Sequence, residues 1–490
     1  MTAKVIINRM ATGIAGLDQI LGGGLPEFSF NLIAGSPGSG KTTLAHQIMF
    51  ALASAERPAL FLTVLGEPPL KMLRYQQQFE FFDTDLSARS IRFVNLAQET
   101  MTGNLDQVLA CIEAEVMAQS PSLVFVDSFR SVTLSNGSDA GAQLAMQQFM
   151  QKLAMLMTSW RATTFLIGEY HANDDANPVF TVADGLIWLH QTLERNSMVR
   201  QVEIRKMRGV PTLPGRHSFR IDQRGIEVFA TAWVPPSRRS RTSNPVPARL
   251  SMGVPQLDDM LGGGLPPRHT LLIAGPSGSG KTLLAMDFLA EGARNGEAGV
   301  IAAFEQHPEE TSDAAIARLV EAGRVAVVEG GAPDLSTEEV LMLLLRHIRR
   351  LGATRVVIDS LSGFELAVAP SFRADFRESL LTLVQVLKAE GVTVVMTCEL
   401  EDRYTDLRFS PYDTAFLTDA IIVQRYIEVD SRLRRVMAVV KMRSSRHSDE
   451  LREYTIEADG IHVGAILADQ EGLLGGRPTR KKSGSNDAGE

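Results

Sequence analysis

The sequence predicts an α/β protein made of two tandem copies of one domain, each with a mostly parallel sheet that helices cover on both faces. Three observations lead to this prediction: the length of 490 residues, a long motif that occurs twice, and short apolar runs that alternate with helix-like stretches. A chain of this length normally contains two or three domains. Apolar residues make up 44% of it and charged residues 22%, which is typical of a globular protein with an ample core.

The repeated motif is the clearest feature of the chain. The first copy, at 12–45, reads TGIAGLDQILGGGLPEFSFNLIAGSPGSGKTTLA, and the second, at 252–285, reads MGVPQLDDMLGGGLPPRHTLLIAGPSGSGKTLLA. An offset of 240 residues separates Lys41 in the first copy from Lys281 in the second. Such self-similarity indicates two homologous domains.

The domain boundaries follow from composition. The segment 234–249, VPPSRRSRTSNPVPAR, is rich in proline, serine and arginine and lacks apolar periodicity, which predicts an exposed linker. We therefore expect the domains at 5–233 and 250–465. The remainder, 466–490, ends in polar and charged residues and is expected to form a disordered tail.

Within the second copy, short apolar runs predict strands and the longer periodic stretches between them predict helices. The predicted strands are 270–274, 300–304, 356–358 and 392–397, and the predicted helices are 281–294 and 376–390. Continuous apolar strands separated by helices are typical of a parallel sheet that is buried on both faces. Antiparallel strands that extend the sheet are predicted at 420–426, 436–442 and 451–456.

Charge and cysteine content exclude several classes of protein. With 49 basic and 57 acidic residues the formal net charge is -8, which argues against nucleic acid as a partner. Cys111 and Cys398 belong to no CxxC motif or Cys/His cluster, so we expect buried thiols rather than a zinc site or a disulfide. No run of 18 apolar residues occurs, and 1–10 lacks the pattern of a signal peptide. We expect a cytoplasmic protein without a membrane partner.

Each copy contains the phosphate-binding pattern GxxxxGK[ST], the Walker A motif. Its glycines let backbone N–H groups point at phosphate oxygens, and the helix that follows presents its positive end to them. Lys41 and Lys281 are expected to neutralise the β- and γ-phosphates, which makes them predicted catalytic residues, and the hydroxyls of Thr42 and Thr282 to ligate Mg²⁺. The predicted ATP-binding residues are Gly35, Ser36, Pro37, Gly38, Ser39, Gly40, Lys41, Thr42 and Thr43, with Gly275, Pro276, Ser277, Gly278, Ser279, Gly280, Lys281, Thr282 and Leu283.

An apolar strand that ends in aspartate accompanies each of these loops. Asp127 closes the run at 123–127, and Asp359 closes the run at 356–359. An aspartate in this place is often only a helix cap. Its pairing with a phosphate-binding loop in both copies instead indicates a Walker B residue that holds magnesium through water. Each copy therefore has a predicted metal site, formed by Thr42 with Asp127 in the first copy and by Thr282 with Asp359 in the second.

These motifs resemble those of the RecA-like ATPases, and specifically those of the KaiC family of double-domain, clock-type proteins. The first copy has Thr-Gly-Ile-x-Gly-Leu-Asp at 12–18 and Gly-Gly-Gly-Leu-Pro at 22–26. The second copy has Gly-Val-x-x-Leu-Asp at 253–258 and the same glycine run at 262–266. The resemblance extends over 5–463 and implies two tandem RecA-like domains that bind ATP with Mg²⁺.

The resemblance also implies stacked hexameric rings with ATP at the subunit interfaces. A neighbouring subunit would supply a Lys-x-Arg pair that stabilises the transferring phosphoryl group. The matching residues are Lys206 with Arg208 in the first copy and Lys441 with Arg443 in the second. The simpler alternative is two basic residues that share the exposed face of a strand.

The family places two adjacent glutamates at the end of the second strand, where one of them polarises the attacking water. The second copy keeps Glu305 and has Gln306 in place of the other, so Glu305 is the predicted general base. The first copy has Leu65 and Gly66 there, and Glu67 is either a substitute or an unconnected surface carboxylate. We expect the first domain to be a slow ATPase or a nucleotide-stabilised ring former.

Two further glutamates occupy equivalent positions in the copies. Glu169 follows the apolar run 165–168, and Glu399 follows the run 394–398. Because both lie at strand ends that face the nucleotide crevice, they are predicted to sit near the γ-phosphate; a strand-end salt bridge is the alternative.

The best-known member of the KaiC family also phosphorylates itself on an adjacent Ser-Thr pair in its second domain. Counting back from Thr418, that pair falls on Ala415 and Phe416, neither of which accepts phosphate. Ser410, Thr414 and Thr418 are the nearby hydroxyls, so only a relocated site would preserve this activity.

The sequence thus predicts a ring-forming, magnesium-dependent ATPase whose nucleotide state signals to an unidentified partner protein. Two alternatives remain at this stage. One is a serine/threonine autokinase, and the other is a RecA-like, DNA-dependent ATPase. The acidic net charge and the lack of a basic, aromatic-rich loop weigh against the second alternative.

Overall fold

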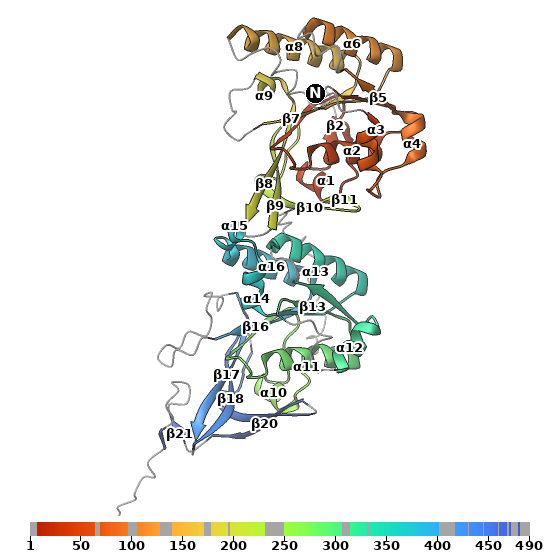
Figure 1. Ribbon diagram of the computed structural model, residues 1–490. Helices are drawn as coiled ribbons and strands as arrows, with labels where there is room; N and C mark the ends of the chain where they lie inside the picture. Colours follow the sequence, from red (N-terminus) through yellow and green to blue (C-terminus); the bar gives the residue numbers. More distant parts are fainter. Residues whose placement is uncertain are drawn as a thin grey trace, which may run out of the picture. The chain divides into compact units, whose positions relative to one another are not determined.

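The computed structural model forms two compact units, Met1–Ala232 and Trp233–Glu490. In each unit, helices flank a central sheet (Figure 1). The structure describes residues 7–63, 69–96, 105–127, 140–170, 178–194, 197–230, 249–305, 314–330, 334–400, 417–429, 431–443, 445–458, 460–467, 470–471 and 479–480.

In the described part of the first unit, nine strands form one sheet in the order β11-β10-β9-β8-β3-β7-β6-β4-β5. The strands from β8 to β5 pair in parallel, whereas β8 to β11 pair antiparallel. Their bounds are β3 Phe30–Gly35, β4 Ala59–Thr63, β5 Ile91–Asn95, β6 Leu123–Asp127, β7 Thr163–Glu169, β8 Gly185–Glu194, β9 Ser197–Met207, β10 Arg216–Asp222 and β11 Gly225–Phe229. A separate small ladder joins β1 (Arg9–Met10) to β2 (Leu25–Pro26).

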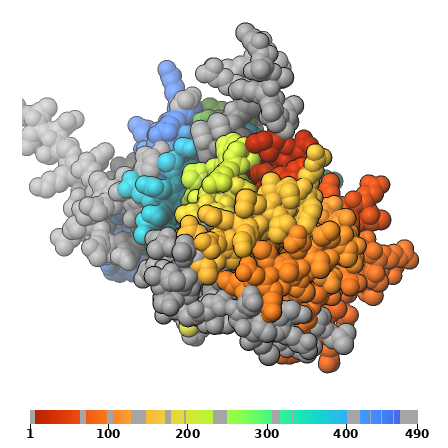
Figure 2. All heavy atoms as spheres, turned by 90° about the horizontal axis from the view of Figure 1, so that it is seen from above, coloured from red at the N-terminus to blue at the C-terminus, as the bar shows by residue number. Residues whose placement is uncertain are grey.

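Alternating side chains along the central strands build two cores, one on each face of this sheet. Ile33 and Ile167 face the helix that follows the phosphate-binding loop, whereas Leu32 and Leu166 face the opposite helices, α6 and α8. Successive strand residues point to opposite faces, so a fully apolar strand must be covered twice. The helices are α1 Leu17–Ile20, α2 Lys41–Leu52, α3 Pro69–Gln76, α4 Thr84–Ser90, α6 Leu105–Gln119, α8 Ala140–Ser159 and α9 Pro178–Val182. Figure 2 shows α6 and α8, in orange and yellow-orange, at the surface of this domain, where they pack against each other.

The described part of the second unit repeats this arrangement, with strand order β14-β13-β15-β16-β12-β17-β18-β19-β20. The strands are β12 Thr270–Gly275, β13 Gly299–Ala303, β14 Val325–Glu329, β15 Arg355–Asp359, β16 Thr393–Glu399, β17 Ala420–Val429, β18 Arg432–Met442, β19 Arg452–Glu457 and β20 Gly460–Ile466. The helices are α10 Pro255–Met260, α11 Lys281–Arg294, α12 Ala314–Glu321, α13 Thr337–Leu351, α14 Leu361–Ala367, α15 Pro370–Arg373 and α16 Phe376–Glu390. Short strands β21 (Gln470–Glu471) and β22 (Thr479–Arg480) pair with each other. The predicted fold class is confirmed.

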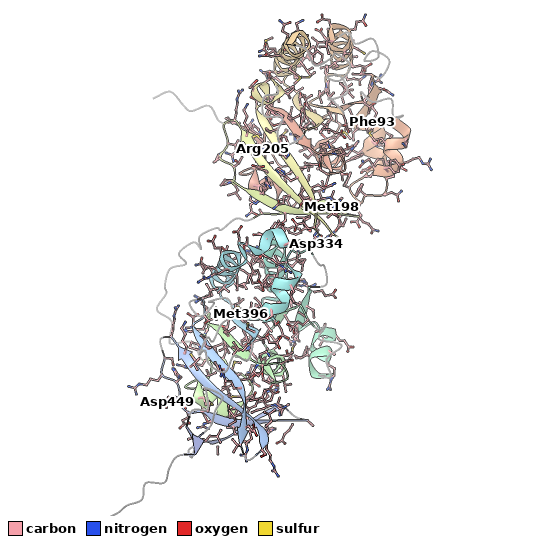
Figure 3. All side chains as sticks on the ribbon, turned by 60° about the vertical axis from the view of Figure 1, so that its left-hand side comes forward. Phe93, Met198, Arg205, Asp334, Met396 and Asp449 are labelled. Atoms are coloured by element: carbon pink, nitrogen blue, oxygen red, sulfur yellow. The ribbon has the colours of Figure 1, made fainter. Side chains whose placement is uncertain are left out.

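The strands of the second unit agree with the apolar runs of the sequence. Each of the four predicted parallel strands coincides with β12, β13, β15 or β16, and β17 to β19 are antiparallel as expected. Met396, labelled in Figure 3, lies on β16 and is completely buried in the core beneath α14 and α16.

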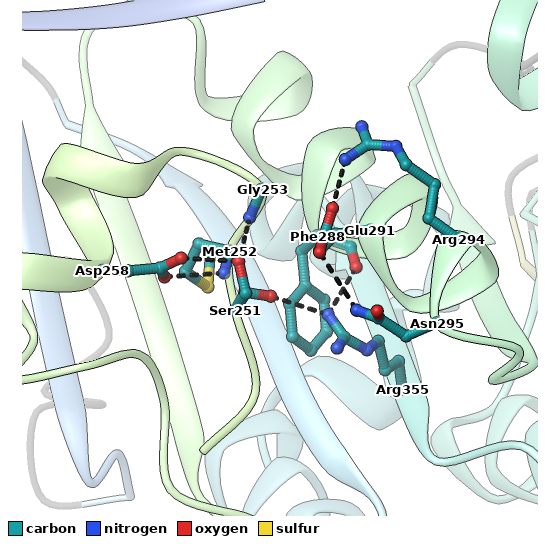
Figure 4. Close-up of polar contacts among 9 residues, drawn as sticks. All are labelled: Ser251, Met252, Gly253, Asp258, Phe288, Glu291, Arg294, Asn295 and Arg355. Atoms are coloured by element: carbon teal, nitrogen blue, oxygen red, sulfur yellow. Dashed lines mark hydrogen bonds and ion pairs between the residues drawn. The ribbon is translucent and has the colours of Figure 1, made fainter. Parts of the chain in front are cut away.

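A buried arginine at the start of β15 ties three parts of the second unit together (Figure 4). The Arg355 guanidinium is 1% exposed, and its Nη1 donates to the carbonyl oxygens of Ser251 and Phe288, each at 2.8 Å. Its Nε donates to Glu297 Oε2 at 2.5 Å, and its carbon Cζ lies 4.5 Å from the centre of the Phe288 ring. A buried charge is tolerated when it is paired and hydrogen-bonded in this way. Arg355 thereby connects the segment that enters the domain to α11 and to the sheet.

Candidate nucleotide-binding sites

The first phosphate-binding loop connects β3 to α2 and depends on its glycines. Gly40 caps α2 in the left-handed region with φ of 97°, and a side chain on it would approach Ile221 Cδ1 at 2.7 Å. A Cβ atom on Gly35 would lie 2.3 Å from the carbonyl oxygen of Leu189. Because only glycine fits both positions, the first turn of α2 can present its free N–H groups to an anion.

The lysine and threonine of this loop lie where the sequence predicts phosphate and metal. Lys41 Nζ donates to the carbonyl oxygen of Ser36 at 2.7 Å, and Thr42 Oγ1 donates to Asp127 Oδ2 at 2.8 Å. The structure therefore brings the Walker A and Walker B residues into direct contact. Burial lowers the pKa of the Lys41 ammonium, and the carboxylates of Glu169 and Asp127 act in the opposite direction. A phosphate placed beside Lys41 would likewise favour its charged form.

The second loop, between β12 and α11, has the same geometry. Lys281 Nζ donates to the carbonyl oxygen of Pro276 at 2.8 Å, and Thr282 Oγ1 donates to Asp359 Oδ1 at 3.2 Å. Burial lowers the pKa of Lys281, while the neighbouring carboxylates, first among them that of Glu399, raise it. Gly280 again caps the helix in the left-handed region, with φ of 94°. The two sites are thus built from corresponding residues.

Glu169 and Glu399 lie beside the first glycine of their respective loops. In the parallel ladders, Glu169 is opposite Gly35 and Glu399 is opposite Gly275. Both carboxylates raise the pKa of the lysine in the adjacent loop. They therefore lie at the same edge of the sheet as the phosphate-binding loops.

Glu305 lies just beyond the end of β13, at the same edge of the sheet as the Walker B strand. Its Oε1 accepts a hydrogen bond from Ser360 Oγ, and Ser360 follows Asp359 directly. Its charge is also among those that raise the pKa of Lys281. The corresponding stretch of the first domain, with Leu65, Gly66 and Glu67, lies outside the described residues, as does Gln306.

Each Lys-x-Arg pair contacts its own domain at the base of the antiparallel extension. Lys206 Nζ donates to the carbonyl oxygens of Phe180 and Thr181 at 3.1 and 3.2 Å, and Arg208 forms a 3.0 Å ion pair with Asp184. In the second domain, Lys441 Nζ donates to the Thr418 carbonyl oxygen at 2.6 Å, and Arg443 lies 3.8 Å from Asp419. The two pairs therefore have equivalent surroundings.

The strand register separates these pairs from the phosphate-binding loop of the same chain. Lys206 is opposite Leu186 near the start of β8, which runs parallel to β3. Leu189, further along β8, is opposite Gly35, where the loop begins. The structure thus brings the Walker residues together but leaves Lys206 and Arg208 toward the other end of β3.

The sequence model of the KaiC ATPase matches 10–232 and 250–468, which covers both repeats. The chain belongs to the KaiC family. Among curated proteins, the circadian clock oscillator protein KaiC of Picosynechococcus sp. is 28% identical over 97% of this chain and 93% of its own length. The circadian clock protein KaiC3 of Synechocystis sp. is 27% identical over 96% of this chain and 95% of its own length.

Two arginines that sequence analysis did not single out also lie beside the KaiC-type loops. Arg200 is opposite Gln191, and the Gln191 side chain lies 3.6 Å from the place of a Cβ on Gly38. Arg435 is opposite Tyr426 and lies 5.6 Å from its ring; the Tyr426 hydroxyl is 3.5 Å from the Ser277 carbonyl oxygen. A sequence signal did exist, because in both copies an arginine precedes the lysine of the Lys-x-Arg pair by six positions.

The donor set of each KaiC-type site suits magnesium. Mg²⁺ prefers hard oxygen ligands and is commonly held by one or two carboxylates together with substrate phosphates and water. Thr42 with Asp127, and Thr282 with Asp359, supply one hydroxyl and one carboxylate each. Across the described ranges, no three His, Cys, Asp or Glu side chains gather to hold a metal ion on their own.

Of the three hydroxyls near the family's autophosphorylation position, Thr418 belongs to the described residues. Ser410 and Thr414 lie outside the described residues, as do Ala415 and Phe416. Thr418 is completely buried, and its carbonyl oxygen accepts a hydrogen bond from Lys441.

None of the helices in the described parts of this KaiC-family chain has the length and apolar character needed to cross a membrane.

Proposed function

We propose that this KaiC-family chain is a magnesium-dependent ATPase that assembles into a homohexameric ring in the cytoplasm and signals its nucleotide state to a partner protein. One observation carries the proposal. In both domains the lysine of the phosphate-binding loop precedes a threonine whose hydroxyl donates directly to the Walker B aspartate. This arrangement of lysine, hydroxyl and carboxylate suits a metal–triphosphate complex.

The residues of each site would have distinct roles in binding the nucleotide and in catalysis. Backbone N–H groups of the loop and the positive end of α2 or α11 bind the phosphates, and Lys41 or Lys281 neutralises charge on the β- and γ-oxygens. Thr42 with Asp127, and Thr282 with Asp359, would hold Mg²⁺, which supplies further neutralisation of the same oxygens when bound. Positioning and charge stabilisation account for most of the catalysis of phosphoryl transfer.

Glu305 is the group that would take a proton from the attacking water in the second domain. It lies at the nucleotide edge of the sheet, and its hydrogen bond from Ser360 fixes it beside the Walker B residue. A positioned base contributes about 10²- to 10⁴-fold to the rate. Because the first copy has Leu65 and Gly66 where the family has its glutamate pair, we propose that it hydrolyses ATP more slowly and serves assembly.

The position of the Lys-x-Arg pairs supports the proposed ring. Lys206 is opposite Leu186, which pairs with Leu32, and Leu32 lies three residues, or roughly 10 Å, before Gly35 along β3. A pair in that place can reach the triphosphate of a neighbouring copy more readily than that of its own chain. A head-to-tail contact of this kind generates a closed ring when its rotation closes, and six copies are what the family resemblance implies.

The proposal is tested by measuring ATP turnover and assembly mass for the intact chain, Lys41→Ala and Lys281→Ala. We expect Lys281→Ala to remove more turnover, because it disables the site with Glu305, and Lys41→Ala to impair assembly more. Lys152→Ala removes an exposed lysine on α8 and serves as the matched control. Equal losses of turnover would contradict unequal roles, and a chain without magnesium-dependent ATP binding would refute the proposal.

A further inference from the structure

The Walker B carboxylate of the second domain is held by two hydroxyls. Asp359 Oδ1 accepts a hydrogen bond from Thr282 Oγ1 at 3.2 Å and a second, close one from Thr397 Oγ1. Thr282 belongs to the phosphate-binding loop, whereas Thr397 lies on β16, the strand next to the Walker B strand. Thr397 is completely buried, so its hydroxyl is confined to the interior between β16 and α11.

The corresponding position of the first domain has no hydroxyl. Thr397 is opposite Ile273 in the parallel ladder of β12 and β16, and Ile167 is opposite Ile33 in the matching ladder of β3 and β7. Ile167 is completely buried in an apolar core. The two sites therefore share the threonine of the loop but differ in the residue that supports the aspartate from the neighbouring strand.

The environment of Asp359 makes this difference consequential. Asp359 is partly buried at the end of β15, where both hydroxyls donate to the same carboxylate oxygen, Oδ1. A hydrogen bond to a charged group is worth more than one between neutral groups, and a buried acceptor left unsatisfied is costly. The Thr397 hydroxyl thus fixes the orientation of the carboxylate from the side of β16, independently of the Thr282 hydroxyl on the loop.

We propose that Thr397 is a positioning residue of the second site, which orients Asp359 for a magnesium–nucleotide complex and lowers the Mg²⁺ concentration that this site requires. The inference rests on the proposed function, since it presumes that the second site binds ATP with Mg²⁺. It adds a residue outside the Walker motifs.

The test uses the full chain carrying Lys41→Ala, so that the second site dominates binding. Affinity for a fluorescent ATP analogue is measured across Mg²⁺ concentrations, and again in EDTA. Three proteins are compared: the Lys41→Ala chain, and the same chain with Thr397→Val or Thr397→Ser added. We expect Thr397→Val to raise the half-saturating Mg²⁺ concentration about three- to tenfold, which corresponds to part of one charged hydrogen bond. Affinity without metal stays within about twofold, and Thr397→Ser, which keeps the hydroxyl, restores the original Mg²⁺ requirement.

The controls separate positioning from a general structural effect. Ile167→Val in the first domain changes a buried residue at the equivalent position and leaves the Mg²⁺ requirement unchanged. If the Thr397→Val variant does not fold, Thr397→Cys takes its place, because its thiol is of similar size but a weak hydrogen-bond donor. The same rise in the Mg²⁺ requirement is then expected. An unshifted Mg²⁺ requirement, or equal losses of affinity with and without Mg²⁺, would overturn the inference alone. No magnesium-dependent binding by the Lys41→Ala chain itself would overturn the proposed function and this inference with it.

Discussion

At the scale of single residues, the two sites also differ in the side chains that pack against the first turn of the helix after the phosphate-binding loop. His46 on α2 illustrates this, because Met286 takes its place in the second domain. The His46 Nδ1 atom lies 2.8 Å from the Thr42 carbonyl oxygen, and since a carbonyl only accepts, Nδ1 carries the proton. The ring stacks on Phe61 with centroids 4.5 Å apart. A neutral imidazole is therefore hydrogen-bonded to the backbone of Thr42, the predicted magnesium ligand.

This histidine makes the stability of the first domain depend on pH. Burial lowers the pKa of His46 to about 4, whereas an unfolded histidine titrates near 6.5. The unfolded state binds the extra proton between these values, so the stabilisation is complete above about pH 6.5 and is lost as the pH falls toward 4. We expect a loss of about 2 kcal/mol in the free energy of unfolding between pH 7 and pH 5.

Urea unfolding at the two pH values measures this effect in the intact chain and in His46→Met, which copies the second domain. The variant should lose the histidine component while retaining the pH dependence of the remaining groups. Identical pH dependence in both proteins would show that His46 does not titrate differently in the folded and unfolded states.

At the scale of strands and helices, sequence reasoning succeeded where the signal is local. The loop at Gly275 and the helix from Lys281 are predictable because one short segment contains the strand, the glycines and the cap. Thr397 and Arg355 were missed because their roles depend on contacts with segments far away in the sequence. Thr397 contacts Asp359 on the next strand, and Arg355 contacts Ser251 and Phe288. The position of Lys206 relative to Gly35 likewise appeared only with the register of β8 and β9.

Arg355 gives a prediction at this scale. Arg355→Met would leave Glu297 and the carbonyl oxygens of Ser251 and Phe288 without the guanidinium that now joins them. Breaking a buried pair from one side typically costs 3–5 kcal/mol, and because Glu297 is partly exposed we expect about 3 kcal/mol in the unfolding of the second domain. Calorimetry of the full chain would show this as a lower melting temperature for one transition.

The first domain supplies the control for this experiment. Leu123 occupies the matching place at the start of β6, where Leu123→Met conserves volume and should cost less than about 1.5 kcal/mol. Similar losses for both variants would mean that the Arg355 contacts contribute no more than ordinary packing.

At the scale of the whole molecule, the proposed function has each site completed by another copy, since the Lys-x-Arg pairs lie away from the loops of their own chain. An isolated subunit would then bind nucleotide without the cations that stabilise the transferring phosphoryl group. Assembly and turnover would be linked, because nucleotide at the interface stabilises the ring and the ring completes the site. This linkage is one physical route by which nucleotide state could alter the surface presented to a partner.

Mixing two inactive chains tests this arrangement directly. Lys281→Ala lacks the loop lysine but keeps Lys441 and Arg443, whereas Arg443→Ala keeps the loop and lacks the arginine. If the pair acts on a neighbour, co-assembly creates some interfaces with an intact loop from one chain and an intact pair from the other. Random mixing in equal amounts would make roughly a quarter of the second-domain interfaces complete. Turnover should therefore rise above the sum of the two separate rings, while chains mixed only after stable assembly show no rise. Action within one chain predicts no recovery under either protocol, because neither chain then holds both groups.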